Sequence, residues 1–498
     1  MHEYLSRRQF AMSCPSSTNG RTDCANPPTN RTNQTALGMS RRDMLRRCSI
    51  GFGQIALAGM LSERAAVANV KDLLAEKQPH FPAKVKRVVL LFLTGGPSHV
   101  DLWDWKPELA KRAGEPRPFN LPDNDMTFGV ENSRLLGPLA KFRPRGASGL
   151  MISDLLPELS RCADDLCLLS GMHADNSAHQ PARRQMFTGV TLHGKPSIGA
   201  WVSYGLGTEN QSLPSFIAMR GAKFERSNGF LPASHQATLL SASSSRPIRH
   251  LVDASMSFAE KRQQLDFIQS LNRSTQEQTA EDPHMEGMIR SMELAFRMQT
   301  EAGSLADFSQ ETPATLKLYG VDHKPTDSAA RQCLLARRCL QAGVRFVSVT
   351  LDSWDHHGNI ANSHPQSCLA VDRPIAGLLR DLKQRGLLQD TLVVCSGEFG
   401  RTPYFQDDPR RVGRPGREHN RYGFTAWLAG GGVRTGFRHG ATDEFGGHAV
   451  EGKVHIHDLH ATILHLLGLD HERLTFRHLG RDFRLTDVAG NVVQDILA

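Results

Sequence analysis

A largely apolar run from Val85 to Leu93 (Val-Lys-Arg-Val-Val-Leu-Leu-Phe-Leu) limits the possible folds of this chain more than any other segment. The run has the length of a strand, and it ends abruptly at Thr94-Gly95-Gly96-Pro97. Nearly continuous apolar strands are buried on both faces, which is typical of a parallel sheet covered by helices. The segment therefore predicts a central strand of an α/β fold, followed by a glycine turn.

The same alternation of strands and helices continues along the chain. Further strands are predicted at 344–351, 391–396 and 424–429, and helices at 155–169, 285–300, 329–342, 371–386 and 458–467. Such alternation predicts a three-layer α/β/α fold, in which helices cover both faces of a mostly parallel central sheet. The segment 191–330 begins with a mixed, Ser-, Gly- and Pro-rich stretch, and we expect it to hold irregular insertions.

The composition and charge exclude some classes of function. The chain has 498 residues, of which 39% are hydrophobic and 22% charged, as in ordinary globular proteins. Its formal charge of +8 is concentrated at the start, where residues 1–68 carry nine Lys or Arg against four Asp or Glu. No dense Lys/Arg face with interleaved aromatic residues follows, so we expect no binding of nucleic acid.

The first 68 residues have the features of a targeting segment. Ser40-Arg41-Arg42-Asp43-Met44-Leu45 matches a twin-arginine export pattern, and Ser6-Arg7-Arg8-Gln9-Phe10 resembles it more weakly. The apolar stretch 48–61 is too short for a stable membrane span, and Ala66-Val67-Ala68 offers a small-x-small cleavage site. We expect a signal peptide within 1–68, a folded domain at 69–498, and export to the periplasm by the twin-arginine translocase. A basic arm without a targeting role is the alternative.

Nine cysteines occur, and six of them lie beyond the predicted signal: Cys162, Cys167, Cys333, Cys339, Cys368 and Cys395. None forms a Cys-x-x-Cys pair, and several lie in apolar runs, so buried free thiols are the expectation. A disulfide between Cys162 and Cys167 is the alternative in an oxidising compartment.

Polar clusters follow the predicted strands, at the edge where ligands bind in open α/β sheets. Asp355 and His357 flank one residue just beyond a strand, and Glu398 and His419 lie beyond the next one. A carboxylate and imidazoles that converge on one cation suit zinc or manganese. The sequence therefore predicts a metal site at these residues. A second register, Asp352 with His356, stays open.

Two further side chains are candidates for contact with a metal or an anion. Arg401 follows Glu398 by three residues, and a guanidinium there can clamp a phosphate or sulfate oxyanion or pair with a nearby carboxylate. Asp101 follows the first strand within Ser98-His99-Val100-Asp101. It is a candidate ligand of a second cation, or else a turn cap.

The stretch from Ser170 to Gly189 holds the best candidates for a nucleophile. Ser177, His179 and Arg183 lie in a predicted loop-to-helix junction that ends in Phe187-Thr188-Gly189. A serine or histidine at a helix N-terminus can attack a tetrahedral ester, and the helix favours an anionic substrate. A polar cap on an ordinary helix is the alternative.

Taken in order, these motifs resemble a known family. They are Leu-Thr-Gly-Gly-Pro-Ser-His-Val-Asp, Leu-Ala-Arg-Arg, Val-Arg-Phe-Val, Trp-Asp-His-His-Gly-Asn, Gly-Glu-Phe-Gly-Arg-Thr-Pro, Ala-Gly-Gly-Gly-Val and Asp-Leu-His-Ala-Thr-Ile-Leu. From about Val85 to Leu485 the chain resembles the sulfatase-like domain-of-unknown-function family numbered fifteen hundred and one. The resemblance places it in the alkaline phosphatase superfamily, whose members use two metal ions and a Ser, Thr or formylglycine nucleophile.

The resemblance carries over to the site only in part. Asp355, His357 and His419 resemble the three ligands of one metal site. At the other site Glu398 takes the place of an aspartate, and Phe399 takes the place of a histidine ligand, so that site looks altered or lost.

The segment from His179 to Gly189 is similar to the sulfatase signature, with His179 where the formylglycine precursor would stand. We therefore expect a hydrolase of small anionic esters or sulfated glycans that uses zinc, manganese or calcium. The alternative is a degenerate member that binds an anionic glycan or a protein without turnover.

Overall fold

The computed structural model describes residues 74–119, 133–210, 212–242, 257–278, 289, 292–298, 304–405 and 413–498. The chain divides into the units Met1–Ala66 and Val67–Ala498, and every described residue belongs to the second unit. The predicted export signal at 1–68 lies outside the described residues.

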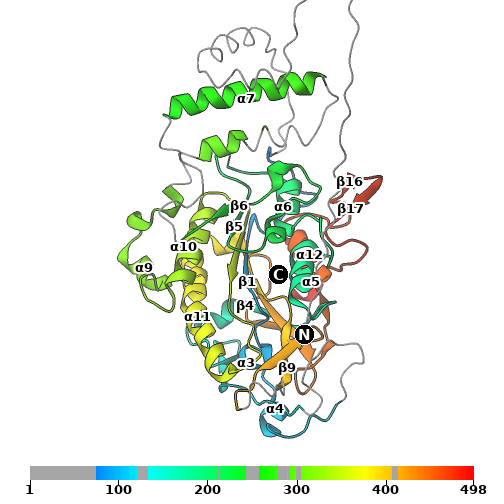
Figure 1. Cartoon of the computed structure of the whole chain (residues 1–498). Coiled ribbons are helices and arrows are strands. Elements are labelled where there is room, and N and C mark those ends of the chain that lie inside the picture. The colour runs from blue at the N-terminus through cyan, green and yellow to red at the C-terminus, as the bar shows by residue number, and fades with distance from the viewer. Residues whose placement is uncertain are drawn as a thin grey trace, which may run out of the picture. The chain divides into compact units, whose positions relative to one another are not determined.

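A nine-stranded, mostly parallel sheet forms the centre of the fold, as predicted (Figure 1). The strand β11 (Phe424–Gly430) is antiparallel to both of its neighbours, whereas the other paired strands of this sheet are parallel. Across the sheet the strands are β12 (Phe437–His439), β4 (Leu166–His173), β11, β8 (Thr391–Ser396), β1 (Arg87–Leu93), β7 (Phe346–Leu351), β5 (Phe216–Met219) and β6 (Thr238–Leu240), and β15 (Val454–His455) also pairs with β4.

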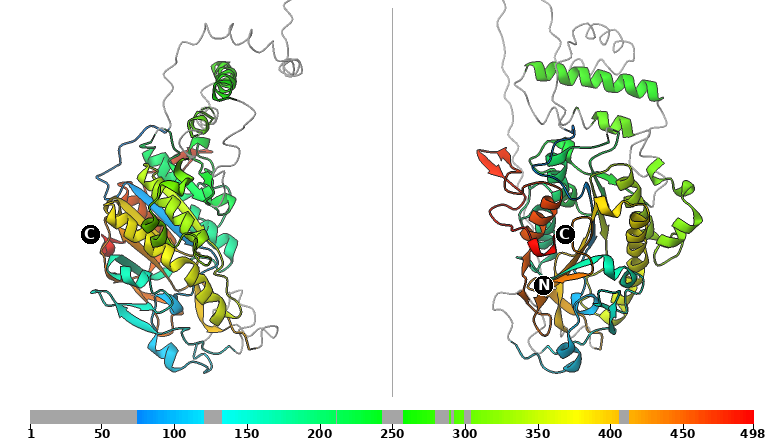
Figure 2. Two further views of the ribbon diagram at one scale, coloured as in Figure 1. Left: turned by 90° about the vertical axis from the view of Figure 1, so that its left-hand side faces the viewer. Right: turned by 180° about the vertical axis from the view of Figure 1, so that it is seen from behind.

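Side chains of β1 alternate between the two faces of the sheet and build two cores. Val89, Leu91 and Leu93 belong to the core under α10 (Asp327–Gln341) and α11 (Ile360–Gln384). Val88, Leu90 and Phe92 belong to the opposite core, with side chains from α5 (His179–Thr188), α6 (Ile198–Leu206) and α12 (Ile456–Leu466). The two groups of helices lie on either side of β1 in two views (Figures 1 and 2), so the three-layer α/β/α prediction is confirmed.

The remaining elements are smaller or lie outside the central sheet. The helices are α3 (His99–Leu102), α4 (Pro107–Lys111), α7 (Phe258–Gln278) and α9 (Pro313–Tyr319). Short 3-10 helices include η2 (Leu159–Asp165) and η3 (Lys223–Arg226). The two-stranded sheets pair β2 (Phe142–Arg145) with β3 (Leu150–Ser153), β9 (Gly400–Phe405) with β10 (Arg417–Asn420), β13 (Ala441–Thr442) with β14 (Ala449–Glu451), and β16 (Phe476–His478) with β17 (Arg481–Phe483).

The predicted helix at 155–169 is wrong. The segment forms η2 and then enters β4, whose apolar residues Leu166 to Leu169 are buried in the sheet. A short apolar run of this kind has the same pattern in a buried strand and in a buried helix, so periodicity alone does not separate them.

The segment expected to hold insertions, 191–330, also supplies two strands of the central sheet. β5 pairs with β7, and β6 pairs with β5, both in parallel. These strands have only four and three residues, which is too short to give a period in the sequence. α7, by contrast, lies away from the sheet in the views of Figure 2.

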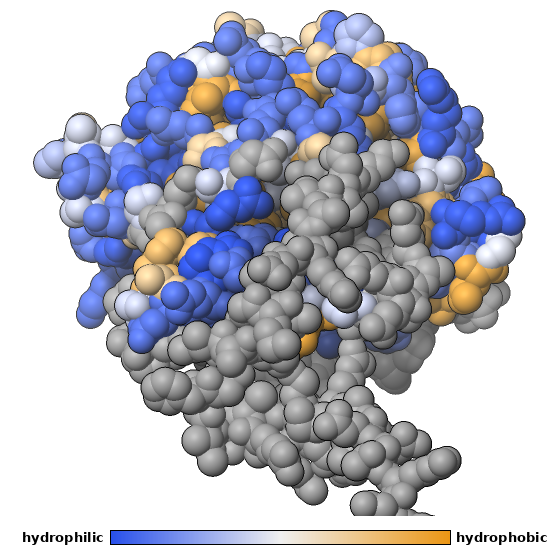
Figure 3. Space-filling model, turned by 90° about the horizontal axis from the view of Figure 1, so that it is seen from above, coloured by the Kyte–Doolittle hydropathy of each residue, from blue (hydrophilic) through white to orange (hydrophobic). Residues whose placement is uncertain are grey.

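The six cysteines beyond the predicted signal are buried and unpaired, as expected. Within the described residues, no helix is both long and apolar enough to cross a bilayer. One face of the surface, seen from above, shows small hydrophobic patches separated by hydrophilic residues (Figure 3).

The strands β1, β7 and β8 run parallel in adjacent positions, so the loops that follow them meet at one edge of the sheet. The turn after β1 is tight against the loop after β7. Gly95 has φ of +115°, and a Cβ atom there would lie 2.5 Å from the backbone nitrogen of Asp355. Only glycine satisfies both conditions, which explains the glycine turn that follows the first strand.

Candidate metal centre

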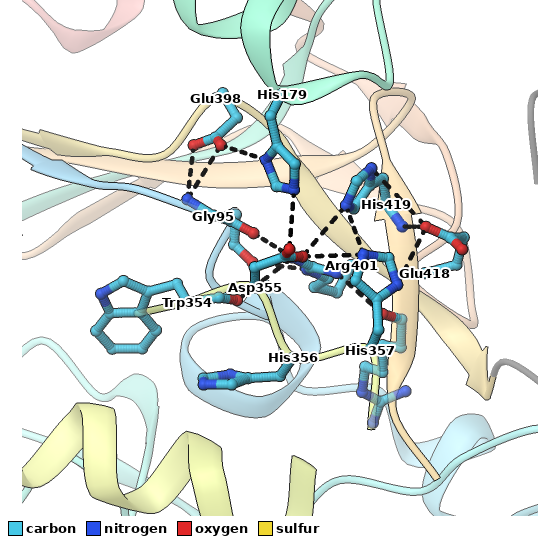
Figure 4. Close-up of polar contacts among 12 residues, drawn as sticks. Gly95, His179, Trp354, Asp355, His356, His357, Glu398, Arg401, Glu418 and His419 are labelled. Carbon is cyan, nitrogen blue, oxygen red and sulfur yellow. Dashed lines mark hydrogen bonds and ion pairs between the residues drawn. The ribbon is translucent and has the colours of Figure 1, made fainter. Parts of the chain in front are cut away.

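Three histidines and one aspartate converge at this edge of the sheet (Figure 4). His179 begins α5, Asp355 and His357 lie in the loop between β7 and α11, and His419 lies in β10. One potential ligand atom from each side chain lies within 4.8 Å of every other. We call these four residues the His/Asp cluster.

The imidazole rings present their Nε2 atoms to the carboxylate of Asp355. His357 Nε2 lies 2.9 Å from Oδ1, and His419 Nε2 lies 3.4 Å from the same oxygen. His179 Nε2 lies 3.2 Å from Oδ2. The side chain of Asp355 is 47% exposed, so the cluster is open to solvent on one side.

The outer nitrogens of His179 and His419 are held by hydrogen bonds, and that of His357 lies near a carboxylate. His179 Nδ1 lies 2.8 Å from Glu398 Oε1, and His419 Nδ1 donates a hydrogen bond of 2.6 Å to the carbonyl of Ser177. His357 Nδ1 lies 3.5 Å from Glu418 Oε1. Histidine ligands of metals are oriented in this way, because the outer contact fixes the tautomer and leaves the inner lone pair free.

The donor set fits one divalent transition metal. His179 Nε2 is buried and lies near Asp355 without a well-formed hydrogen bond, as a ligand atom does before a cation binds. Nitrogen ligands with one carboxylate suit zinc and also accept manganese. Calcium usually takes six to eight oxygen ligands, so this set fits calcium less well.

The charges in the cluster are strongly coupled. Burial alone would raise the pKa of Asp355, but its contacts with the imidazoles of His179 and His357 and the charge of Arg401 hold it far below its usual range. Burial opposes the protonation of His179, yet the neighbouring carboxylates of Asp355 and Glu398 raise its pKa to about 9. Burial lowers the pKa of His419 to about 3, so its ring is neutral near pH 7.

Arg401 lies in β9 beside the cluster, but its donors are directed into the protein. Its side chain is 1% exposed, and Nη2 donates to Asp355 Oδ1 at 2.6 Å. The other donors reach the carbonyls of Gly95, Gly96 and Arg417. The expectation of an oxyanion clamp is therefore corrected: this guanidinium positions Asp355 and ties three loops together.

Glu398 is fully buried and serves His179 rather than the centre of the cluster. Its two carboxylate oxygens accept hydrogen bonds from the backbone nitrogen of Gly95 at 3.0 and 3.1 Å. Oε1 also contacts His179 Nδ1. The structure thus places Glu398 behind a ring of the cluster, and not among the four converging atoms.

Asp101, the remaining candidate ligand, does not join the cluster. Its carboxylate forms a two-pronged ion pair with Arg417 at 2.8 and 3.1 Å, and both side chains are fully buried. Ser98 Oγ and the backbone nitrogen of Leu139 donate to it as well. With four donors already bound, Asp101 has no free oxygen lone pair directed at a cation.

The side chains of the two other candidates near α5, Ser177 and Arg183, do not join the His/Asp cluster. Ser177 contacts the cluster through its backbone carbonyl, which accepts from His419. Arg183 forms an ion pair with the buried Glu225. The alternative pair of ligands, Asp352 with His356, is not part of the cluster either. Asp352 forms an ion pair with Arg220 and lies outside the four converging residues.

Sequence reasoning missed two contributors. Glu418 contacts the outer nitrogen of His357, and its position next to a predicted ligand was the only signal for it. Phe399 was expected only as a lost ligand, yet its ring centroid lies 4.4 Å from that of His419, with an angle of 32° between the ring planes. This aromatic side chain packs against the cluster at His419.

The comparisons with solved structures give low sequence identities. The lipoteichoic acid synthase LtaP from Listeria monocytogenes is 9% identical, with 86% of this chain and 81% of that chain covered and a TM-score of 0.38. The sulfatase PsFucS1 from Pseudoalteromonas sp. is 13% identical, with 84% of this chain and 72% of that chain covered and a TM-score of 0.36. The alkaline phosphatase from the Antarctic bacterium TAB5 is 10% identical, with 77% of this chain and 98% of that chain covered and a TM-score of 0.31.

A search of the curated proteins gives no match. The family model, by contrast, spans residues 85–497, which is most of the chain and includes the whole His/Asp cluster. This protein belongs to the family described as "Protein of unknown function (DUF1501)".

Proposed function

We propose that this chain is an exported, metal-dependent hydrolase that acts on sulfate or phosphate esters. Asp355, His357 and His419 would hold the divalent metal. The observation that carries the proposal is the convergence of three imidazole Nε2 atoms on one half-exposed carboxylate, with the outer nitrogens of His179 and His419 hydrogen-bonded and that of His357 near Glu418. When bound there, a divalent cation would supply Lewis-acid polarisation of the ester.

His179 is the better placed of the two proposed nucleophiles. Glu398 orients its ring through Nδ1, so that Nε2 points to the open cluster, whereas Ser177 contributes a carbonyl. In this proposal Nε2 attacks the phosphorus or sulfur atom and the ester oxygen leaves; water then cleaves the new bond. Attack requires the neutral imidazole, which a positive charge nearby favours by repelling the proton.

The position of His179 also favours an anionic substrate. It is the first residue of the ten-residue helix α5, where backbone N–H groups and the helix dipole attract negative charge. The substrate class indicated is a small anionic ester or a sulfated glycan.

Export belongs to the same proposal. The twin-arginine pattern at Arg41 and Arg42 would send the folded protein to the periplasm, with its metal already bound. Export of a folded chain suits a site whose ligands come from segments far apart, because the site exists only after folding.

A second candidate function is anion binding without turnover. Two observations argue against turnover: Phe399 packs where the resemblance puts a ligand, and the donors of Arg401 are used within the protein, so they would not stabilise a reacting anion. Such a protein would hold an anionic glycan or a protein partner at the same edge of the sheet.

One experiment separates the two functions. The protein is purified and its metal content measured, and a panel of sulfate and phosphate esters is screened for release of the anion. Turnover that is lost on chelation, restored by zinc or manganese and absent in His419→Ala supports the hydrolase. His448→Ala is the matched control, because His448 is half-exposed and lies outside the cluster. A metal-free protein that hydrolyses none of the esters supports the binding function.

A further inference from the structure

A second charged group lies on the same edge of the sheet as the cluster. β5 and β7 are parallel neighbours in the register Met219↔Val349, so the residues that follow them lie side by side. Arg220 follows β5, and its Nη2 lies 2.7 Å from Oδ2 of Asp352, which follows β7. Asp352 is three residues before Asp355, so the loop that carries two members of the cluster also contacts Arg220.

The backbone at this contact is held in an unfavourable conformation. Arg220 has φ of +67° and Ser353 has φ of +84°, in the left-handed region that side chains other than glycine seldom adopt. The ion pair itself is exposed, at 56% for Arg220 and 42% for Asp352. Exposed pairs contribute too little to stability to offset such strain, and strain of this kind is concentrated at functional sites.

Further cations lie on α5 and on η3, which meet the segment of Arg220 at Glu225: a Cβ atom on the next residue, Gly221, would clash with the Glu225 carboxylate, and this carboxylate pairs with Arg183. The rings and charges interleave there, since the guanidinium carbons of Arg183 and Arg184 lie 5.8 and 5.6 Å from the ring centroid of Phe224. We call the five cations of these segments the basic rim: Arg183, Arg184, Arg220, Lys223 and Arg226.

The carboxylates near the basic rim do not balance it. Glu225 pairs with Arg183, and Asp352 pairs with Arg220, which leaves an excess of positive charge. The Nε atoms of Arg183, Arg184 and Arg226 are buried and have no hydrogen-bond partner among the described residues. The ion pair with Asp352 engages one terminal nitrogen of Arg220, so the other N–H donors of its guanidinium group face solvent.

The basic rim and the cluster share structural elements, so they can act on one ligand. Arg183 lies one helical turn beyond His179 on α5, and residues four apart lie on the same face of a helix. The loop after β7 joins Asp352 to Asp355. A ligand bound at the cluster would therefore extend toward the basic rim.

We propose that the basic rim binds a second anionic group of the substrate, a sulfate or a phosphate, with Arg220 as its main exposed donor. The substrate is then a molecule with at least two anionic groups, such as a multiply sulfated saccharide or a sugar bisphosphate. This inference rests on the proposed function for the reaction at the cluster, but it concerns binding, which can be measured without turnover.

Calorimetric titration of the metal-free protein with two pairs of ligands tests the proposal. One pair is a disulfated and a monosulfated disaccharide, and the other is a sugar bisphosphate and its monophosphate. We expect the doubly charged member of at least one pair to bind at least about tenfold more tightly, as one good charge-assisted contact allows. The pair that shows this preference identifies the anion.

The double variant Arg220→Gln/Lys223→Gln should remove the preference, so that the ratio of the two affinities approaches one. Arg477→Gln is the control, because Arg477 is also an exposed arginine in an ion pair, on the hairpin β16–β17 and outside the basic rim. Circular dichroism confirms that each variant is folded. Equal binding of both members of both pairs by the unmodified protein, or a preference that persists in the double variant, overturns the proposal.

The result is independent of the proposed function. His419→Ala should keep the preference for the doubly charged ligand, since His419 lies in the cluster and outside the basic rim. Loss of turnover in His419→Ala with an unchanged preference supports both proposals. Absence of turnover in every protein, together with a preference that depends on Arg220, would retain the basic rim and reject the hydrolase.

Discussion

The Nε2 atoms of His357 and His419 face each other at 2.9 Å, although the residues are 62 positions apart in the chain. His419 uses its Nδ1 proton for the carbonyl of Ser177, so its Nε2 carries a lone pair in the neutral ring. His357 Nε2 also lies 2.9 Å from Asp355 Oδ1, so the three atoms surround one point. Three electron-pair donors around one point favour a cation between them.

Removing one of these donors should weaken metal binding. We expect His419→Ala to lower zinc affinity by about tenfold or more, because even outer contacts of metal ligands are worth that much. Competition with a chromophoric chelator measures the affinity directly. His448→Ala should leave it unchanged, and a His419→Ala protein that keeps the affinity of the unmodified protein would remove His419 from the site.

The two proposed nucleophiles should differ in their effect on turnover. We expect His179→Ala to lower the rate of ester hydrolysis by more than about a hundredfold, as for an essential acid, base or nucleophile. Ser177→Ala should have a small effect, because Ser177 contacts the cluster through its backbone carbonyl, which alanine retains. Mass spectrometry of enzyme quenched with denaturant at alkaline pH, where a bond from phosphorus or sulfur to an imidazole nitrogen survives, should show a phosphoryl or sulfuryl group on the peptide that contains His179. Full activity in both variants would instead indicate direct attack by water.

Arg401 should be essential for the stability of the loops around the cluster. Arg401→Met removes the donors of the buried carbonyls of Gly95, Gly96 and Arg417 and leaves Asp355 without its cation. Each buried acceptor without a donor costs about 1–3 kcal/mol, so we expect the free energy of unfolding to fall by at least about 3 kcal/mol.

Urea denaturation of metal-free protein measures this change. Arg477→Met, an exposed arginine in an ion pair, should change stability by no more than about 1 kcal/mol. Equal stability of the Arg401→Met and Arg477→Met proteins would show that the buried guanidinium has no such role.

The sequence predicted the parts of the site that depend on local order. Asp355 and His357 lie just beyond a strand, and His419 follows the next one, so the rule that ligands gather at the carboxyl ends of parallel strands brought them together. The loop-to-helix pattern of the segment from Ser170 to Gly189 located His179 near a helix start, although it gave no reason to place His179 beside Glu398. That contact joins residues 219 positions apart.

Long-range ion pairs explain where the sequence-based expectations failed. Asp101 follows a strand end as a ligand would. Its partner Arg417 is 316 residues away, and no local sequence pattern predicts their ion pair. Arg401 has the spacing of an anion clamp, and its burial against three carbonyls depends on the packing of the whole edge. In the fold, β5 and β6 were hidden because strands of four and three residues leave no periodic signal.

Export should depend on the twin-arginine pair. Arg41→Lys with Arg42→Lys should leave unprocessed precursor in the cytoplasm, because the translocase recognises those guanidinium groups. Fractionation and immunoblotting of cells that produce the protein measure the distribution. A further variant in which Arg7 and Arg8 are also changed tests whether the second motif acts as a backup. Normal processing after Ala68 in the fourfold variant would contradict export by this route.

The stability of the protein should fall in mild acid because of buried neutral histidines. His460 lies in α12, is fully buried and donates from Nε2 to the carbonyl of Met186 at 2.8 Å, and burial lowers its pKa to about 3. The unfolded chain takes up a proton at this residue below its ordinary pKa of 6.5, whereas the folded chain does not until about 3. This contribution to stability is therefore complete above pH 6.5 and is lost as the pH falls toward 3.

Between about pH 7 and about pH 5 this residue alone should reduce the free energy of unfolding by about 2 kcal/mol. Urea denaturation of metal-free protein at both pH values measures the loss, and His460→Gln should reduce it by that amount, because glutamine does not titrate and can still donate to Met186. His448→Gln is the matched control, since it makes the same substitution at a histidine that is 48% exposed and lies outside α12. An identical pH dependence in unmodified protein and in His460→Gln would show that His460 is not held neutral by the fold.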